Sequence, residues 1–453
     1  MILFNSLKFI FRFFPIFLAV YYLTPARFRE IILFFGSIIF YAMGTGRMAL
    51  ALIGLTLINY FLGKLVFSRK TGNVKSSSRK AFIAAMVIDV GSLVLFKVLA
   101  GFTRDVVLPL GFSFYLFKMI SYQADLFRGE IKRQPEILDT VVYFTMFTQV
   151  TQGPIMRYNN VGFEKRERTV SVKAFNDGMF FFVLGLGMKV LVADPLSILW
   201  NEISKIGYES ISTPLAWMGA VGYSLRLYMD FWGYSLMAAG IGMMLGFHFV
   251  VNFMHPYWAY GIADFYRRWH TTLGSWFRDY VYIPLGGSRK GRLRTALNLI
   301  VVWLLTGLWH GITPNYLIWA GVLVLLILWE KFVAARLMDA LPILGHLHVW
   351  FFIPLTWVIF AIPDVNGILS YFQRLFPFFG SGINVNRGDY IKQMINYWPY
   401  LGAGLMLCTP HWYRLIVKNR RRMPVMIIMA AVFWISVYRI VIAASNPFMY
   451  FSF

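Results

Sequence analysis

Apolar runs long enough to cross a lipid bilayer recur along the whole chain. The hydrocarbon core of a bilayer is about 30 Å thick, so a spanning helix needs about 20 mostly apolar residues. Backbone N–H and C=O groups must be satisfied internally in lipid, which makes helices the expected form of such runs. The sequence therefore predicts an all-α integral membrane protein with roughly 11 to 14 transmembrane or re-entrant helices. Their expected centres lie near residues 15, 37, 57, 90, 115, 147, 187, 220, 238, 303, 324, 356, 402 and 434.

The composition excludes a soluble globular protein. Hydrophobic residues make up 58% of the 453 residues, charged residues only 14%, and the mean hydropathy is +0.61. A chain with so little polar surface is typical of membrane proteins. The formal net charge is +23, but Lys and Arg gather in short blocks between apolar runs. This pattern follows the positive-inside rule, so we expect a bilayer as the partner and no nucleic acid.

The basic blocks also predict the orientation of the chain. We place four of them in the cytoplasm. They comprise Arg69, Lys70, Lys75, Arg79 and Lys80; Arg128, Lys132 and Arg133; Lys165, Arg166 and Arg168; and Arg414, Lys418, Arg420, Arg421 and Arg422. The less basic, Gly/Asn-rich stretch 364–392 is our candidate for a loop on the outer face. The apolar amino-terminal segment through Tyr22 has no cleavage-site pattern and is expected to remain as a helix.

No linker, composition break or repeat divides the sequence. We therefore expect one polytopic membrane domain over residues 1–453, with the motif-bearing core at about 109–334 and peripheral helices at 1–108 and 335–453. Cys408 is the only cysteine, which excludes an internal disulfide and a cysteine-rich metal site within this chain.

Two histidines, His270 and His310, lie in this apolar setting. Ionisable residues at membrane depth are costly unless they are paired or functional, so each histidine is a candidate site. A hydroxyl is a poor nucleophile at neutral pH, and histidine is well suited to act as its general base.

His310 belongs to a sequence stripe with helical spacing. If residues 295–311 form a helix, Trp303, Gly307 and His310 share one face, and Pro314 would continue it. Glycine there would let a substrate chain or a neighbouring helix come close. The alternative is a buried histidine bonded to a backbone carbonyl and packed among tryptophans such as Trp309; spacing alone leaves both interpretations open.

His270 lies in a charged stretch. Its neighbours in sequence are Asp264, Arg267, Arg268, Arg278 and Asp279, followed by PLGGSRKGRLR. A Gly-rich backbone beside cations can receive phosphate oxygens, such as those of coenzyme A or of a carrier protein's phosphopantetheine. Arg278, Arg289 and Lys290 are our candidates for donor contacts. The alternatives are an ordinary cytoplasmic basic loop and, for Arg278 and Asp279, a structural ion pair.

A third polar group lies in YSLRLYMDFWGYSLMAAG. Arg226 and Asp230 are four residues apart, so a helix would place them on one face as a neutralising pair. Lys118, Asp125, Gln149, Gln152 and Arg157 add to the polar set, and nothing in their spacing assigns chemistry.

Ordered motifs between residues 109 and 311 resemble the membrane-bound O-acyltransferase (MBOAT) family, in its bacterial branch that acts in alginate O-acetylation and teichoic acid D-alanylation. The motifs are PLGFSFYLFKMISYQADLFRGE, QGPIMRY, GLGMKVLVADPL, LYMDFWGYSLMAAGIGMMLGF, NFMHPYWAYGIADFYRRWHTTLGSWFRDYVYIPLGGSRKG and TGLWHG. The Gly-Gly turn is closer to the acetylation type. DFWGYSLMA departs from that type's DFSGYSDMA at Trp232 and Leu236, which leans towards the D-alanyl type.

The resemblance implies a ring of helices around a tunnel, and acyl transfer from a cytoplasmic thioester to a hydroxyl outside. It carries the role of the essential histidine onto His310 and that of the branch's second histidine onto His270. It also implies acetyl-CoA or another acyl thioester as co-substrate, with no permanently bound cofactor or metal. The expected partners are an extracytoplasmic acetylesterase-like acyltransferase, a polysaccharide acceptor and, for D-alanyl transfer, an acyl carrier protein. The expected location is the bacterial inner membrane.

Two other classes of function fit many spans with buried charges. A transporter or flippase would move its substrate without a thioester. A non-catalytic scaffold that recruits envelope enzymes would tolerate loss of both histidines. Neither class explains the histidine motifs, so an O-acyltransferase is the favoured interpretation.

Overall fold

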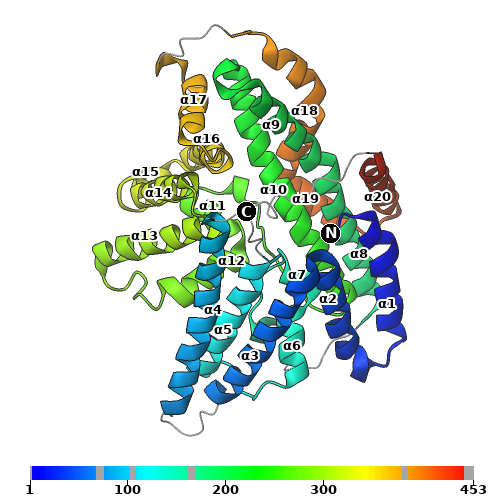
Figure 1. Ribbon diagram of the computed structural model, residues 1–453. Coiled ribbons are helices and arrows are strands. Elements are labelled where there is room, and N and C mark those ends of the chain that lie inside the picture. The colour runs from blue at the N-terminus through cyan, green and yellow to red at the C-terminus, as the bar shows by residue number, and fades with distance from the viewer. Residues whose placement is uncertain (1–2, 68–75, 103–108, 162–169, 380–384, 443–453) are drawn as a thin grey trace. The chain divides into compact units, whose positions relative to one another are not determined.

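The computed structural model describes residues 3–67, 76–102, 109–161, 170–379 and 385–442 (Figure 1). Within these ranges the secondary structure is helical and contains no strand. Of the predicted cytoplasmic blocks, Arg69, Lys70 and Lys75 and the whole block Lys165, Arg166 and Arg168 lie outside the described residues. The prediction of an all-α membrane protein is confirmed by these helices.

Seven helical segments among the described residues are long and apolar enough to cross a membrane. The first holds two helices, α2 (Arg29–Thr45) and α3 (Ala49–Phe67), and the third joins α8 (Val172–Gly187) to α9 (Asp194–Ile206) through a π-helical turn. The segments are Ala26–Phe67, Ser76–Leu99, Val172–Ile206, Gly291–His310, Pro314–Met338, Pro342–Ala361 and Met423–Ile442. They include the predicted centres near 37, 57, 90, 187, 303, 324, 356 and 434.

The other predicted centres also lie in or beside helices, which are shorter or more polar. They are α1 (Phe14–Leu23), α5 (Phe112–Arg128), α6 (Ile137–Thr145), α7 (Phe147–Val150), α10 (Thr213–Met244) and α18 (Asp389–Cys408). The two spans predicted near residues 220 and 238 are wrong as separate elements, because α10 is one helix of 32 residues. Its glycines interrupt the hydropathy without breaking the helix.

The stretch predicted as an outer loop is partly helical. Asp364 caps the amino terminus of α17 (Val365–Leu375), where its carboxylate accepts the backbone N–H of Gly367 at 2.7 Å. Ile368, Tyr371 and Leu375 are buried along one face. The buried apolar residues of α17 are separated by polar residues, so the mean hydropathy of the segment is low and its sequence predicts a loop. Residues 380–384 of this stretch lie outside the described residues.

The chain forms two compact units. The first is built mainly from residues within 1–182 and 234–250, and the second from residues within 183–233 and 251–439. In the first unit, α3, α4 (Ser76–Phe102) and α5 pack together. Asn59 on α3 donates to Asp89 on α4 at 2.8 Å and receives the Gln123 amide of α5 at 2.9 Å. These bonds connect the three helices at the buried centre of the trio.

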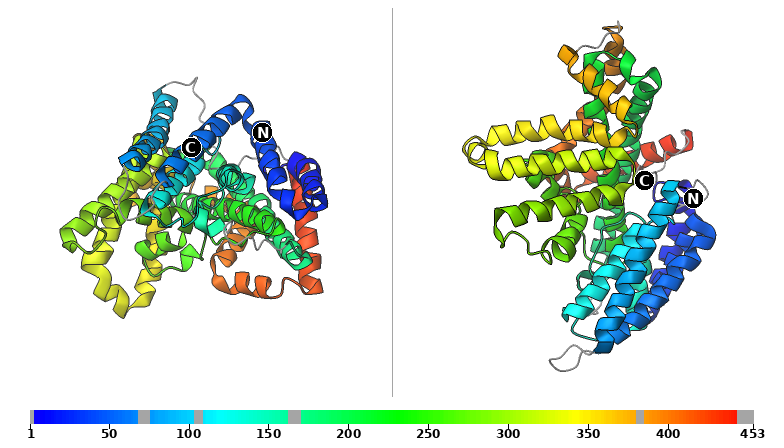
Figure 2. Two further views of the ribbon diagram at one scale, coloured as in Figure 1. Left: turned by 90° about the horizontal axis from the view of Figure 1, so that it is seen from below. Right: turned by 60° about the vertical axis from the view of Figure 1, so that its left-hand side comes forward.

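The second unit holds both histidines. Its α13 (Gly291–His310), α14 (Pro314–Trp329) and α16 (Pro342–Ala361) lie side by side in the green-to-yellow part of the ribbon (Figures 1 and 2). Two short helices, α11 (Ile262–Arg268) and α12 (Thr271–Phe277), precede α13, and a π-helical turn over Arg278–Tyr282 follows α12. The unit also contains α15 (Ala335–Ala340), α19 (Pro410–Lys418) and α20 (Met423–Ile442). The motif residues 252–311 therefore lie in α11, α12, α13 and the segments that flank and join these helices.

Candidate active site

His310 is the last residue of α13, at a tight hairpin with α14. A Cβ atom at Gly311 would lie 2.6 Å from the Tyr316 ring, and one at Gly307 would lie 2.9 Å from the Tyr316 carbonyl oxygen. Only glycine fits at both positions, so the helices approach closely beside the histidine. Trp303, Gly307 and His310 share the buried face of α13, as the spacing predicts. Pro314 does not continue this face, because α13 has ended and Pro314 begins α14 in an exposed position.

The imidazole of His310 lies among aromatic rings. Its side chain is buried, and its ring centroid is 4.6 Å from that of Trp309, 5.3 Å from Trp319 and 4.9 Å from Phe360. Trp319 and Phe360 meet it edge to face. This packing fixes the ring and excludes bulk water from much of its surface. A histidine held in this way can exchange a proton with a substrate that reaches it.

His270 occupies the corner between α11 and α12. Its φ of 45° lies in the left-handed region, which is uncommon for a residue with a Cβ. Its Nδ1 lies 3.0 Å from Oδ1 of Asn252, which also accepts the Thr272 hydroxyl at 2.9 Å. The Phe231 ring meets the imidazole edge to face at 4.7 Å. These contacts set the ring orientation, and Asn252 is a partner that the sequence motifs did not single out.

His270 is also electrically neutral at pH 7. It lies outside the seven candidate spans and is only 2% exposed. Burial lowers the pKa of its imidazole to about 3, because the charged form loses its hydration. A neutral ring whose Nδ1 donates to an amide oxygen presents its other nitrogen as an acceptor.

A chain of indole rings links the surroundings of the two histidines. Trp319, beside His310, stacks with Trp357 at 5.8 Å, and Trp357 lies 5.1 Å from Trp269, the residue before His270. Trp303 joins the same cluster at 5.8 Å from Trp319. The structure therefore brings His270 and His310, far apart along the chain, to the border of one aromatic cluster.

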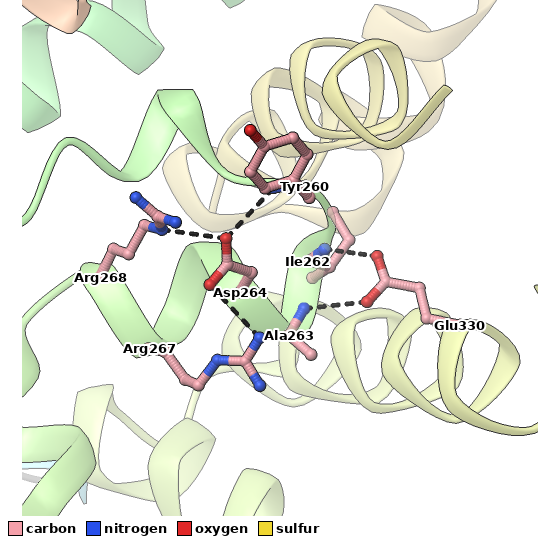
Figure 3. A network of polar contacts seen from close by, with 7 residues as sticks. All are labelled: Tyr260, Ile262, Ala263, Asp264, Arg267, Arg268 and Glu330. Carbon is pink, nitrogen blue, oxygen red and sulfur yellow. Dashed lines mark hydrogen bonds and ion pairs between the residues drawn. The ribbon is translucent and has the colours of Figure 1, made fainter. Parts of the chain in front are cut away.

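The charges near His270 in sequence largely neutralise one another. The Asp264 carboxylate accepts from Arg268 at 2.9 Å, from Arg267 at 3.3 Å and from the backbone N–H of Tyr260 at 3.2 Å (Figure 3). Arg278 and Asp279 form an ion pair at 2.7 Å, the structural alternative considered for them. Arg267 and Arg278 are mostly exposed, so these surface pairs contribute little stability.

The Gly-Gly turn has a defined backbone. Gly286 has a φ of 108° and Gly287 a φ of 56°, both in the positive-φ range that glycine adopts without steric cost. Asn298 on α13 donates to the Gly287 carbonyl at 2.9 Å, and this holds the turn against the helix. Arg289 and Lys290 are exposed, so they are accessible to an anionic ligand. Their contact with donor phosphates stays a prediction.

The predicted Arg226–Asp230 pair is wrong. The Asp230 carboxylate contacts Lys189 at 2.7 Å, and Lys189 also contacts Asp194 at 2.7 Å. The Arg226 guanidinium instead lies over the Tyr223 ring at 5.4 Å. Lys189 lies in the π-helical turn between α8 and α9. Packing of this turn against α10 therefore gives Asp230 a partner from another helix in place of Arg226 on the adjacent turn of α10. The place of Lys189 within the motif GLGMKVLVADPL, shortly before Asp194, is the signal that could have identified this lysine.

Gln152 lies in the first compact unit. It is buried, and its side-chain nitrogen has no hydrogen-bond acceptor among the described residues. Nearby in sequence, Lys118 donates to Gln149 at 3.0 Å, and Gln149 borders a cavity of about 20 Å³. The cavity has room for about one water molecule. A role of Gln152 in acyl transfer stays a prediction.

Comparisons with known proteins agree with the motifs. The profile described as MBOAT, membrane-bound O-acyltransferase family, matches residues 116–371. The probable alginate O-acetylase AlgI of Pseudomonas syringae pv. tomato is 33% identical over 394 residues, which cover 83% of this chain and 75% of that protein. The peptidoglycan O-acetyltransferase of Helicobacter pylori is 29% identical over 426 residues, covering 83% and 80%. The teichoic acid D-alanyltransferase of Bacillus subtilis is 26% identical over 295 residues, covering 60% and 72%. The chain, a multi-pass membrane protein and an O-acyltransferase, therefore belongs to the membrane-bound O-acyltransferase family.

Proposed function

We propose that this enzyme transfers an acetyl group from a cytoplasmic acyl thioester, with acetyl-CoA as donor, for O-acetylation of an extracytoplasmic polysaccharide. The observation that carries the proposal is His310, buried at the end of α13 among Trp309, Trp319 and Phe360. The names of the similar proteins, alginate O-acetylase and peptidoglycan O-acetyltransferase, support acetyl transfer to a polysaccharide. The bacterial sources of these proteins support a bacterial inner-membrane location.

His310 acts in this mechanism as the general base. It takes the proton of the acceptor hydroxyl while that oxygen attacks the thioester carbonyl carbon. The C–O bond forms, the C–S bond breaks, and the thiolate leaves and takes up a proton. The thioester supplies the activation, and hydrogen-bond donors around the carbonyl oxygen lower the barrier.

His270 and the basic turn serve the donor side. The Asn252 bond holds the neutral imidazole of His270 in one orientation, as a donor-orienting group requires. The exposed Arg278, Arg289 and Lys290 bind donor phosphates through charge and hydrogen bonds. The positive-inside rule places these cations on the cytoplasmic side, where an acyl thioester is available. The hydroxyl that attacks the thioester through a tunnel is a serine of an acetylesterase-like partner. The polysaccharide hydroxyl then attacks the acetyl ester on that serine outside, and the serine hydroxyl is released with its proton restored.

D-alanyl transfer to teichoic acid from an acylated carrier protein is the second candidate. Trp232, which departs from the acetylation pattern, stacks on Tyr228 at 5.0 Å and packs against Tyr413 at 5.0 Å. The aromatic residue at this position therefore has partners in the second unit. The similarity to a teichoic acid D-alanyltransferase supports keeping this alternative.

The test uses membranes that contain the full chain and its polysaccharide-producing host machinery. Radiolabelled acetyl-CoA and a D-alanyl carrier protein are supplied in separate reactions, and label in the polysaccharide is counted. We expect acetyl label, and we expect His310→Ala to reduce it by about a hundredfold to ten-thousandfold, as loss of a general base typically does. His411→Ala is the control, because His411 is exposed on α19.

Normal acetyl label with His310→Ala at equal membrane abundance would contradict the role of His310. Label from the carrier protein alone would replace acetyl transfer with D-alanyl transfer. Transport of a polysaccharide precursor in purified vesicles without any thioester would favour a transporter.

A further inference from the structure

Helix α11 begins without a capping side chain of its own. Its N-cap residue is Gly261, which offers no side-chain acceptor to the free N–H groups of the first turn. Glu330, at the end of α14, supplies the acceptor from another helix (Figure 3). One carboxylate oxygen accepts the N–H of Ala263 at 2.9 Å, and the other accepts the N–H of Ile262. A single carboxylate thus caps α11 and ties it to α14.

The surroundings of Glu330 leave little room for another arrangement. A Cβ atom at Gly261 would lie 2.9 Å from a Glu330 oxygen, and one at Gly345 on α16 would lie 2.3 Å from the Tyr260 carbonyl oxygen. The Glu330 side chain is only 8% exposed, and Nε2 of His348 lies 3.2 Å from its Oε1. A buried carboxylate is costly without such partners, so its place at this junction is specific.

Each helix joined by this contact leads to one of the two histidines. α11 ends at Arg268, directly before Trp269 and His270, so the direction of α11 sets where His270 lies. α14 forms the tight hairpin with α13 that ends in His310. The contact between Glu330 and the start of α11 therefore joins the helix that directly precedes His270 to the far end of α14, the helix that follows His310.

We propose that Glu330 is a positioning residue for acyl transfer, which fixes the separation of His270 and His310 by anchoring α11 to α14. It contacts neither histidine and takes no part in proton transfer. The inference rests on the proposed function for the importance of the two histidines to turnover, but the anchoring itself is independent of the donor and of the acceptor.

The anchoring is measured first, in the full-length protein without any substrate. Spin labels are placed at Arg267→Cys on α11 and Leu325→Cys on α14, two exposed positions, while the buried Cys408 does not react. Glu330→Gln keeps the size but has one acceptor oxygen for two N–H groups. We expect its interspin distance distribution to broaden or shift. Asp364→Ala is the matched control, because Asp364 caps α17, which carries no candidate site residue; it should leave the distribution unchanged.

Turnover per folded molecule is measured next in the acetyl-transfer assay. We expect Glu330→Gln to lower kcat by about tenfold to a hundredfold, as displacement of a reacting group by about 1 Å does. KM for the donor should change less, Glu330→Asp should restore part of the rate, and Asp364→Ala should match the wild type.

Two results would overturn the proposal. An unchanged distance distribution in Glu330→Gln would show that Glu330 does not anchor α11 to α14. A changed distribution with normal kcat per folded molecule reduces Glu330 to a stabilising residue. Failure of wild-type acetyl transfer, by contrast, would count against the proposed function while the distance measurement still tests the anchor.

Discussion

Nδ1 of His270 lies 3.0 Å from the side-chain oxygen of Asn252, and the backbone beside it is paired as well, with the N–H of Thr271 donating to the Asn252 carbonyl at 3.0 Å. The amide oxygen accepts, so Nδ1 carries the proton. This bond selects both the orientation and the tautomer of a buried, neutral imidazole. The tautomer of His270 is thus set by Asn252, a residue outside its own helix turn, whereas burial keeps the ring neutral.

Removal of the Asn252 acceptor should impair His270 without unfolding the protein. Asn252→Leu keeps the number and branching of the side-chain heavy atoms but leaves Nδ1–H without its bond, and we expect about tenfold slower turnover. Asn252→Asp keeps an acceptor and should lose less. Kinetic assays on purified protein, normalised to folded enzyme, measure both. Equal rates for the wild type and Asn252→Leu would show that this bond does not matter for turnover.

Acid should destabilise the protein through the buried His270 and the half-buried His255. Burial lowers the pKa of His270 to about 3, and burial with Arg414 and Arg268 nearby lowers the pKa of His255 to about 4. An unfolded histidine has a pKa of about 6.5, so the unfolded state binds protons first as the pH falls. The stabilisation is complete above about pH 6.5 and is lost as the pH falls towards the folded pKa.

For His270 alone the loss reaches about 2 kcal/mol at pH 5. Thermal unfolding in detergent between pH 8 and pH 5 measures it, and His270→Gln should flatten the decline. A variant with the same slope as the wild type would assign the acid sensitivity to other groups.

Lys189 contacts two carboxylates at once, those of Asp194 and Asp230, each at 2.7 Å. Lys189→Met leaves the buried Asp230 and the partly buried Asp194 without their ammonium, which should cost about 3 to 5 kcal/mol of folding stability. Lys189→Met combined with Asp230→Asn removes one of the stranded charges and should recover part of the loss. Membrane abundance and thermal unfolding compare the variants. If the double variant is as unstable as the sum of both single variants, the two side chains are not coupled.

The α13–α14 hairpin depends on the absence of a side chain at position 307. In Gly307→Ala the new Cβ atom would lie 2.9 Å from the Tyr316 carbonyl and 3.0 Å from the Ala320 Cβ, so the helices must separate beside His310. We expect about 1 to 3 kcal/mol of destabilisation and a lower turnover. Gly321→Ala on α14 is the control, since nothing lies within 4 Å of its Cβ position. Similar losses in both variants would point to glycine flexibility and away from the close helix contact.

The fold class could be predicted from the sequence because the features that determine it are local along the chain. Run length, hydropathy and the clustering of cations need no knowledge of tertiary structure. The stripe of Trp303, Gly307 and His310 was equally readable, because helical spacing fixes which residues share a face. The same local rules failed at Pro314, where the helix had ended, and at residues 220 and 238, where one long helix replaces two spans.

These local rules could not predict which residues on different helices contact one another. Asp230 had Arg226 one turn away, yet it pairs with Lys189 of another helix. Neither Asn252 nor Glu330 could be recognised as a partner from spacing, since their bonds to His270, Ile262 and Ala263 cross 18, 68 and 67 residues.

The sequence by itself determined a helical membrane protein of this family and the identity of its two motif histidines. Only the tertiary structure decided which helix ends meet, which carboxylate faces which donor, and how the two imidazoles are held. The physical reason is that hydropathy and spacing act along the chain, whereas hydrogen bonds and ion pairs form across packed helices. Side-chain volume and the glycines at 261, 307 and 345 set how closely those helices approach.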